Sequence, residues 1–452
     1  MAPGDLPLRV DRQAASDRAG YFSYLLAMFL IGSLAIETTV QIFRQFRTCG
    51  RFSPVDGAVL MAACAFASAL FRMRNLRARL LLVFFAFLLG MAGMEAAIYF
   101  FSLRLPREVW PSGLDVTLRP EGTLPGITGP SRVTAHPPGV RGQKWPTPAT
   151  LRLLAIGGSA TECLYLDDTE TWPALLAVEL TARRGDRVWV GNVGRAGLNT
   201  ADHVALVRHF PPAREVDGWI VLCGVNDLLQ NLSGSYRIYK RNARTRSFVH
   251  PMLGDTPART RRPLYRNLLS WRALEHAFNP DRAVGIRQDA TGEWVREQQR
   301  LRRAAKRVDI LPDLAPFLAE YRLQLHSLLD EAQVRRKPVA LCTQPVLWRD
   351  NLSTREEEML CMGRRDETAY YSAAALARGM DAFHAVTRAV AADRGALLVD
   401  LAAEIEASSD FFYDDCHFTE AGARRVAAVI ARVLFEHGWP MRQTGNNLSA
   451  QP

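Results

Sequence analysis

The chain has 452 residues, of which 48% are hydrophobic, so it can bury a large core and carry further segments beside it. Its net charge is +10, but no recognisable nucleic-acid-binding module accompanies that charge, so nucleic acid is not expected as a partner. Its 7 cysteines form no CxxC pair and no Cys/His cluster, which argues against a structural zinc site, and no metal or other cofactor is expected.

The N-terminal part of the sequence predicts a transmembrane region at residues 21–102, after a short tail at 1–20. The stretches 21–40 and 80–101 are each long and apolar enough to cross a bilayer, and 57–71 is a shorter candidate for a third span. The first stretch is long and lacks a clear A-x-A exit, which favours a retained anchor over a cleaved signal peptide.

The distribution of arginine around these stretches favours, with three spans, a cytoplasmic N-terminus and an extracytoplasmic catalytic domain. With two spans that domain would face the cytoplasm. The sequence therefore predicts an integral protein of the inner or plasma membrane, with the lipid bilayer as one partner.

Residues 103–150 are rich in proline and glycine and show little periodicity, which predicts an irregular connector. Over residues 151–438, short apolar runs alternate with helical patterns, as is typical of βαβ units and a doubly wound parallel sheet. A polar tail at 439–452 is expected to be disordered. The predicted strands are 152–156, 187–193, 218–223, 338–344 and 396–400, and the predicted helices are 171–184, 200–209, 314–334, 367–392 and 419–436.

Residues 231–310 interrupt this alternation after the third strand, and we interpret them as an insertion. The excess of Lys and Arg is concentrated here. Such a run is consistent with a solvated arginine-rich helical insertion, or with a surface for anionic lipid headgroups or an acidic polysaccharide. Because ligands bind at the carboxyl ends of parallel strands, the insertion is also a candidate for a substrate-facing lid.

The run LRLLAIGGSAT at 151–161 predicts a strand that stops at Gly157 and Gly158 and leaves Ser159 on a tight turn. In an open α/β sheet this is the edge at which ligands bind. A serine hydroxyl there is a candidate nucleophile, provided that a base removes its proton. The alternative is an ordinary strand-to-helix turn, because Gly-Gly-Ser is common in loops.

The candidate base lies in the segment YDDCH at 413–417, where Asp414 precedes His417 by three residues. On a tight loop, that spacing lets a carboxylate hold one imidazole nitrogen and leaves the other free to face Ser159. The neighbouring Asp415 is expected to point elsewhere.

Acyl transfer also requires donors aimed at the developing oxyanion. The candidates are the backbone amide of Ser159, a backbone amide at Gly197 in NVGRAG, and the side-chain amide of Asn226 in GVND. Each of these segments alone has an ordinary structural explanation as a turn or a helix cap. Their occurrence in this order, each following a predicted strand or preceding the last helix, favours a catalytic site.

At these residues the chain resembles the SGNH (GDSL-type) hydrolases, over roughly 152–437. The matching segments are GGSAT with Ser159, NVGRAG with Gly197, GVND with Asn226, and DDCH with Asp414 and His417. The resemblance implies a flavodoxin-like five-stranded parallel sheet. It also implies a serine nucleophile at Ser159, a His417 base oriented by Asp414, oxyanion donors at Ser159, Gly197 and Asn226, and esterase, lipase, carbohydrate deacetylase or O-acetyltransferase activity without a metal.

Two further features bear on this resemblance, one against it and one in its favour. The usual GDS has become Gly157-Gly158-Ser159, so the aspartate that commonly precedes the nucleophile is missing, and we expect altered loop geometry more than lost activity. The segment PPGVRG at 137–142 is similar to one often found in this family ahead of the first motif, which is GGSAT here.

Separately, Cys163 and Cys416 flank the predicted site and are candidates for a disulfide in an oxidising compartment.

The sequence thus predicts a membrane-anchored serine esterase that removes acyl or acetyl groups from a cell-envelope glycan or lipid, with envelope polysaccharide machinery as a candidate partner. One alternative is an O-acyltransferase in which a sugar hydroxyl replaces water. Another is a non-catalytic glycan-binding scaffold, which the changed GGS segment and the basic insertion would suit.

Overall fold

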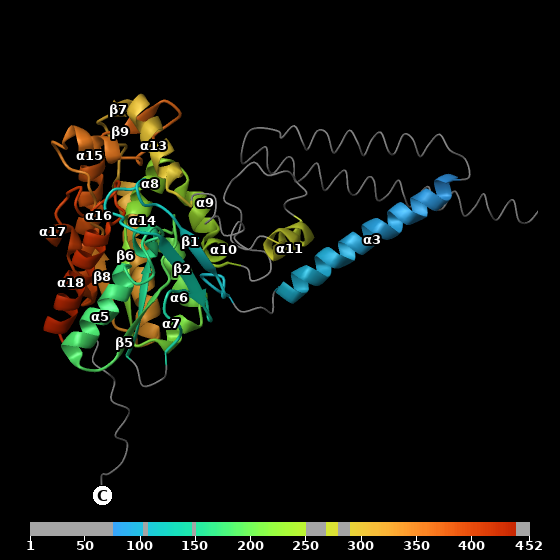
Figure 1. Cartoon of the computed structure of the whole chain (residues 1–452), viewed down its shortest axis with the longest axis horizontal. Coiled ribbons are helices and arrows are strands. Elements are labelled where there is room, and N and C mark those ends of the chain that lie inside the picture. The colour runs from blue at the N-terminus through green and yellow to red at the C-terminus, as the bar shows by residue number, and fades with distance from the viewer. Residues whose placement is uncertain (1–75, 103–106, 147–150, 250–267, 279–289, 440–452) are drawn as a thin grey trace, which may run out of the picture. The chain divides into compact units, whose positions relative to one another are not determined.

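The structure is a computed structural model and describes residues 76–102, 107–146, 151–249, 268–278 and 290–439. The chain divides into two compact units, Met1–Leu105 with Pro257–Ala277, and Pro106–Thr256 with Phe278–Pro452. The second unit is built on an 8-stranded sheet with the order β1-β2-β3-β5-β4-β6-β8-β10 (Figure 1). Its strands are β1 Asp115–Leu118, β2 Ser131–His136, β3 Val140–Arg141, β4 Leu151–Gly157, β5 Val188–Asn192, β6 Gly218–Cys223, β8 Val339–Thr343 and β10 Leu397–Val399.

The strands β5, β4, β6, β8 and β10 run parallel and coincide with the predicted strands to within about one residue at each end. Almost every position of β4, β5, β6 and β8 is buried, as expected for strands covered on both faces. The predicted doubly wound α/β sheet is therefore confirmed. In its register Gly157 pairs with Leu222, and Ala155 pairs with Asn192, so the carboxyl ends of β4, β5 and β6 lie together.

Helices cover this sheet in two groups. α5 packs on α18, and α14 packs on both α6 and α16 (Figure 1). The larger helices are α5 Trp172–Arg184, α6 Thr200–His209, α8 Val225–Leu232, α13 Glu293–Ala304, α14 Ala315–Val334, α16 Ala373–Arg394 and α18 Glu420–Glu436. The shorter ones are α4 Ser159–Glu162, α7 Pro212–Glu215, α9 Tyr236–Arg241, α10 Ala243–Arg246, α15 Thr354–Met359 and α17 Leu401–Glu404.

The segment predicted to be an irregular connector contains three strands, so the sheet has 8 strands rather than five. β1, β2 and β3 are antiparallel, and β3 pairs with β5 through Arg141 and Asn192. Trp110, just ahead of β1, is 1% exposed. Short strands separated by prolines and glycines carry little periodicity, which is why the sequence did not reveal them.

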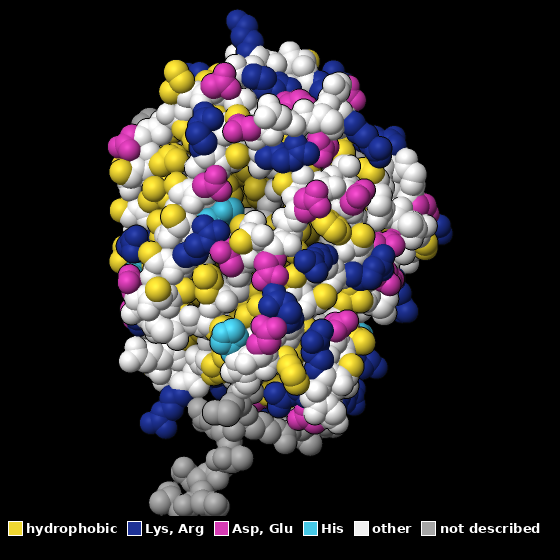
Figure 2. Space-filling model, turned by 90° about the vertical axis from the view of Figure 1, so that its left-hand side faces the viewer, with side chains coloured by type: hydrophobic (Ala, Val, Ile, Leu, Met, Phe, Trp, Pro, Cys, Tyr) yellow, Lys and Arg dark blue, Asp and Glu magenta, His cyan; other side chains and the backbone are white. Residues whose placement is uncertain are grey.

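The insertion at 231–310 supplies α9, α10, α13 and the strand β7 Lys306–Val308 to the second unit. β7 pairs with β9, Ala369–Tyr371, so this part of the insertion is anchored in the unit. On the face shown in Figure 2, Lys and Arg side chains are interspersed with Asp and Glu side chains among the described residues, without one continuous field of positive charge. The predicted disordered tail lies outside the described residues except for Trp439, which packs against the core.

The predicted transmembrane region is not upheld. The stretches 21–40 and 57–71 lie outside the described residues, and 80–101 falls within α3, Leu76–Ser102. Among the helices that the structure describes, none is both long and apolar enough to cross a membrane, which contradicts the predicted integral-membrane location. The prediction rested on apolar content, yet α3 carries Glu95, whose carboxylate accepts backbone hydrogen bonds from Leu269 and Ser270 in α11, Leu269–Phe278.

Candidate active site

Ser159 is the first residue of α4, separated from the end of β4 by Gly158, and is half-buried. The two glycines before it are required by close packing. A Cβ at Gly157 would lie 2.1 Å from Oγ1 of Thr161, and a Cβ at Gly158 would lie 2.4 Å from Nδ2 of Asn226. Glycine at residue 158 therefore lets Asn226, in the GVND segment, lie close to the turn that carries Ser159. A side chain at residue 158 would displace the Asn226 amide.

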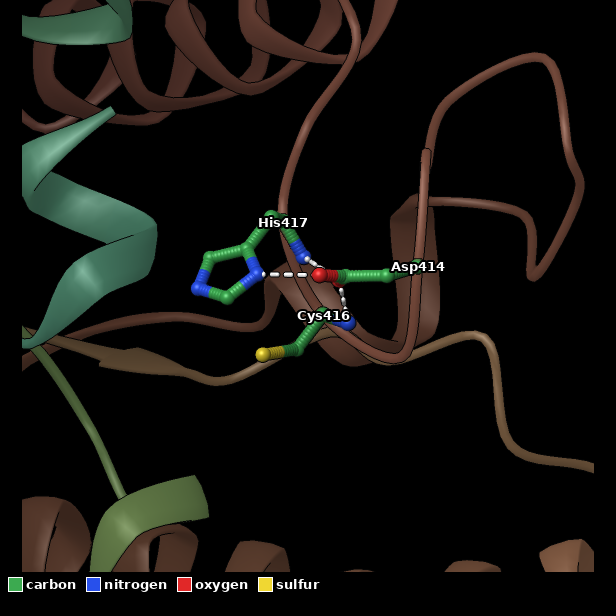
Figure 3. A group of neighbouring side chains, drawn as sticks. All are labelled: Asp414, Cys416 and His417. Atoms are coloured by element: carbon green, nitrogen blue, oxygen red, sulfur yellow. Dashed lines mark hydrogen bonds and ion pairs between the residues drawn. The ribbon is translucent and has the colours of Figure 1, made fainter. Parts of the chain in front are cut away.

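Asp414 and His417 form a closed hydrogen-bonded pair on one loop (Figure 3). The His417 Nδ1 atom lies 2.6 Å from Oδ2 of Asp414, while the backbone N–H groups of Cys416 and His417 donate to Oδ1 at 3.0 and 2.9 Å. Asp414 is completely buried. The second ring nitrogen of His417 points away from Asp414, so one nitrogen is occupied and the other is available for proton transfer.

Electrostatics around His417 favour its protonated form. Burial alone would lower its pKa, but the charge and the hydrogen bond of Asp414 outweigh burial and raise the pKa above the ordinary value, with a further contribution from Glu162. Glu162 belongs to α4, three residues after Ser159. The loop of His417 and the helix that begins at Ser159 therefore lie close enough to interact electrostatically.

Aromatic contacts join the same two segments. The ring of Tyr413 stacks on the imidazole of His417 with centroids 5.5 Å apart, and it meets the ring of Tyr165 edge-on at 6.2 Å. Tyr165 follows α4 by three residues. These contacts fix the plane of the imidazole ring from the side of the serine segment.

Asn226 connects the first three predicted motifs. It lies in the first turn of α8, directly after β6, and its Nδ2 atom donates to the carbonyl oxygen of Leu198 at 2.8 Å. An amide nitrogen carries two hydrogens, so the bond to Leu198 leaves a second N–H beside the Gly158 turn.

Gly197 lies on the turn between β5 and α6, with a φ of +73°, which favours glycine. Its carbonyl oxygen accepts a hydrogen bond from Nε2 of Gln230 at 2.7 Å. The glycine that packs directly against α4 is another one, Gly194, where a Cβ would lie 2.3 Å from the backbone nitrogen of Glu162. A Cβ at Gly197 would meet only Nη2 of Arg246, at 3.7 Å, so the close approach that sequence reasoning did not identify is at Gly194.

Two further polar residues that sequence reasoning missed hold the far end of α4. Arg141 is 2% exposed and donates to the carbonyl oxygens of Glu162 and Leu166, the latter at 2.7 Å. Asn192, which ends β5, donates from Nδ2 to the carbonyl oxygen of Thr161 at 2.8 Å. The sequence offered one signal for each residue. Asn192 is a polar residue at the end of an apolar strand, and Arg141 is the arginine of the PPGVRG segment.

Asp415 bonds a different set of groups from Asp414. It accepts from Nε1 of Trp348 at 2.7 Å and from the backbone N–H groups of Cys361 and Met362 at 2.6 and 3.0 Å. It therefore anchors the His417 loop to the segments after β8, and takes no part in the contact between Asp414 and His417.

All five cysteines in the described part of the chain are unpaired, including Cys163 and Cys416. The Cys163 sulfur contacts the carbonyl oxygen of Ala160 at 3.2 Å, and the Cys416 sulfur contacts the sulfur of Met362 at 3.9 Å. Burial raises the pKa of the Cys163 thiol to about 12. Both thiols are protonated at neutral pH, and the predicted disulfide is absent from the described residues.

Asp414, Cys416 and His417 carry potential metal-binding atoms within 4.8 Å of one another. However, both Asp414 oxygens already accept hydrogen bonds from this loop, and burial raises the pKa of the Cys416 thiol well above its ordinary value. The contacts fit a carboxylate that orients a histidine better than a metal-binding set.

Comparison with known proteins identifies the family. The model of the GDSL-like lipase/acylhydrolase family matches residues 155–425. A comparison with curated proteins gave no significant match. Among solved structures, the chain is similar to an acetylxylan esterase from Geobacillus stearothermophilus, with a TM-score of 0.36 and 16% identity over 64% of this chain and 96% of that one. It is also similar to an α/β hydrolase from the metagenome of Lake Arreo, Spain, with a TM-score of 0.35 and 17% identity over 63% of this chain and 95% of that one.

The structural similarities are too low to carry an argument about substrate. The family match spans more than half of the chain and includes Ser159, Gly197, Asn226, Asp414 and His417. The chain therefore belongs to the GDSL-like lipase/acylhydrolase family and is an ester-hydrolysing enzyme.

Proposed function

We propose that this enzyme hydrolyses carboxylic acyl or acetyl esters of a glycan or lipid through the triad Ser159, His417 and Asp414. The observation that carries the proposal is the 2.6 Å contact between His417 and a completely buried Asp414, on a loop that packs beside the segment following Ser159. The glycan or lipid class of the alcohol comes from the sequence resemblance to a family that contains carbohydrate deacetylases and lipases.

In the first half-reaction, the Ser159 oxygen attacks the ester carbonyl carbon while the second ring nitrogen of His417 takes the hydroxyl proton. Asp414 holds the other ring nitrogen as a donor and stabilises the imidazolium that forms. The raised pKa of His417 makes it a stronger base for this proton. The carbon–oxygen bond to the alcohol then breaks, and the leaving alcohol takes the proton back from His417.

The negative charge that develops on the carbonyl oxygen requires fixed donors. The proposed donors are the backbone N–H groups of Ser159 and Gly197 and the Nδ2 group of Asn226, with Asn226 already held by its bond to Leu198. In the second half-reaction water attacks the acyl carbon while His417 takes a proton from it. The bond between the acyl carbon and the Ser159 oxygen then breaks, His417 returns the proton to that oxygen, and the acid is released.

The test is hydrolysis of p-nitrophenyl acetate, butyrate and palmitate by the full chain and by its Ser159→Ala variant. The expected result is release of p-nitrophenol that depends on Ser159. A preference for acetate would support a deacetylase, and a preference for palmitate would support a lipase. Release at the rate of the Ser159→Ala variant for all three esters would contradict the proposal. Release that needs an added polysaccharide acceptor would replace hydrolysis by acyl transfer.

A further inference from the structure

The basic insertion delivers one arginine to the turn that carries Gly197. This residue is Arg246, which ends the short helix α10. Its Nη2 atom lies 2.5 Å from the carbonyl oxygen of Gly197, and its Nη1 atom lies 2.7 Å from Oδ2 of Asp202. The guanidinium group thus bridges two acceptors on either side of the turn that leads into α6.

Both acceptors are well fixed. Asp202 is completely buried, and its Oδ2 atom also accepts the backbone N–H of Asn199, the residue that caps α6. The ring of Tyr239 lies under the guanidinium carbon of Arg246, with 3.9 Å to the ring centroid. The guanidinium group of Arg246 is stacked on one face and hydrogen-bonded through two nitrogens, so it has little freedom to reorient.

The Gly197 turn is held by three side-chain donors on two adjacent carbonyl oxygens. Arg246 and Gln230 donate to Gly197, and Asn226 donates to Leu198. Because Gly197 has a φ of +73°, its two flanking peptide planes are linked by torsions for which glycine has several accessible values. Donors on the carbonyl oxygens select one of these values, and with it the direction of the Gly197 N–H.

We infer that Arg246 is a positioning residue that sets the Gly197 turn as an oxyanion-binding element. This inference rests on the proposed function, because it assigns Arg246 to the same transition state. It gives the insertion an indirect part in the chemistry. The segment 236–249 packs through α10 on α6 and places the Arg246 guanidinium group at the Gly197 turn. The residue acts through Gly197 and does not itself touch the substrate.

Of the two hydrogen bonds that the Arg246 guanidinium group donates, the bond to Gly197 is the one that should affect kcat. The bond to Asp202 partners a buried carboxylate and so contributes to folding stability. A lysine at this position can keep a positive charge beside Asp202, but its single ammonium lacks the planar pair of donors that reach both acceptors. Arg246→Lys and Arg246→Ala therefore separate the two effects.

The experiment measures kcat and KM for p-nitrophenyl acetate in the wild-type chain, Arg246→Lys, Arg246→Ala and Ser159→Ala. The matched control is Arg241→Ala, which removes an exposed arginine from the preceding helix α9. We expect kcat to fall about 10- to 100-fold in both Arg246 variants, somewhat less than for loss of an oxyanion donor, with little change in KM. Arg241→Ala should match the wild type. Millimolar guanidinium should restore part of kcat in Arg246→Ala alone, which general destabilisation would not allow.

A wild-type rate equal to that of Ser159→Ala would overturn the proposed function, and with it this inference. Serine-dependent wild-type activity with an unchanged kcat in a folded Arg246→Lys would overturn the inference alone. If Arg246→Ala does not fold, Arg246→Lys still decides. A rise in KM with an unchanged kcat would also count against the inference, because it would indicate that Arg246 contributes to binding the ground state.

Discussion

The contacts of single residues explain how a weak hydroxyl could be activated in this chain. Asp414 is buried, lies on the same tight loop as His417, and accepts hydrogen bonds from two backbone N–H groups and from the imidazole. These bonds orient the imidazole before any substrate binds, so the cost of arranging the base is met during folding.

Asp414→Asn should lower kcat/KM for p-nitrophenyl acetate by about a thousand- to ten-thousand-fold, because the amide favours the wrong imidazole tautomer. As the proposed base, His417 can accept a proton only when it is neutral. Since Asp414 raises the pKa of His417, the acid limb of the wild-type profile should lie above the ordinary value of 6.5. In the variant the limb should move to lower pH.

The control for this profile is Asp410→Asn, which removes an exposed carboxylate from the same segment. It should leave both kcat/KM and the pH of the acid limb unchanged. An acid limb at the same pH in Asp414→Asn as in the wild type would mean that another group governs the titration.

Gly158→Ala should lower kcat about a hundred-fold or more, because the new Cβ would lie 2.4 Å from Nδ2 of Asn226 and would displace this proposed oxyanion donor. KM should change little. Gly129→Ala is the matched control, since a Cβ there has no neighbouring atom within 4 Å. Steady-state kinetics of the two variants check the prediction, which would be wrong if both kept the wild-type kcat.

At this scale the sequence was informative where chemistry demands particular residue types. The spacing of Asp414 and His417 predicted the pair that the structure contains. It did not show which groups Arg141 and Arg246 contact, because these include the backbone carbonyl oxygens of Glu162 and Gly197, which are distant in sequence. Contacts to backbone carbonyls have no residue-type signature that a single sequence displays.

At the scale of elements, the site depends on how α6 and α8 begin. Asp227, in the first turn of α8, is completely buried and accepts hydrogen bonds from Thr200 at the start of α6, at 2.9 Å from its hydroxyl. The two helices that follow β5 and β6 are thus joined at their N-terminal ends. These are the ends that carry the Gly197 turn and Asn226.

This junction should make folding stability depend on pH. Burial raises the pKa of Asp227 from 3.8 to about 7, so the folded state binds a proton that the unfolded chain has lost. The contribution of this group is therefore fully present below pH 3.8 and is lost as the pH rises through about 7. Asp227→Asn, which cannot ionise, should gain thermal stability relative to the wild type as the pH rises from 3.8 to about 7, and the gain should then level off.

Differential scanning calorimetry of both chains across this range checks the prediction. A constant difference in Tm at every pH would show that the pKa of Asp227 is the same in the folded and unfolded states. Asn keeps an acceptor for the backbone N–H of Thr200, so a general loss of structure is not expected.

The elements that the sequence predicted well are those with strong periodicity. Strands β4, β6 and β8 are buried apolar runs flanked by glycine, proline or polar residues, and their bounds followed from the sequence. The bounds of the antiparallel strands β1 to β3 did not follow from the sequence, because short strands between prolines give weak patterns. The pairing of β3 with β5 depends on tertiary structure, which those patterns do not show.

At the scale of the whole molecule, residues ahead of β4 complete the catalytic unit. Arg141 forms an ion pair with Asp168 at 2.9 Å and donates to two carbonyl oxygens after Ser159, while Trp110 donates to Gly194 at 3.1 Å. A fragment that begins near residue 150 would lack these contacts. The part of the chain that resembles the family is thus supported by a segment outside the family match at 155–425.

Arg141→Ala should lower the free energy of unfolding by about 3–5 kcal/mol, because it leaves buried acceptors without a donor. The matched control is Arg132→Ala, whose ion pair with Asp115 is exposed at 62% and 53% and should contribute little to the free energy of unfolding. Urea denaturation of the two variants tests this. Equal midpoints would contradict a structural role for Arg141.

The largest error of the sequence interpretation also belongs to this scale. Apolar content over 80–101 indicated a membrane span, but composition does not show what a helix contacts. The only charged residue in that stretch, Glu95, accepts hydrogen bonds from the first turn of α11, which the sequence separates from it by a long interval.

The triad is tested most directly by mass spectrometry of the full chain after reaction with a fluorophosphonate, which labels only an activated serine. We expect one adduct, located on Ser159, and none in Ser159→Ala, with labelling slowed strongly in His417→Ala. Labelling at another serine, or labelling of Ser159 at the same rate without His417, would show that this triad does not perform the reaction.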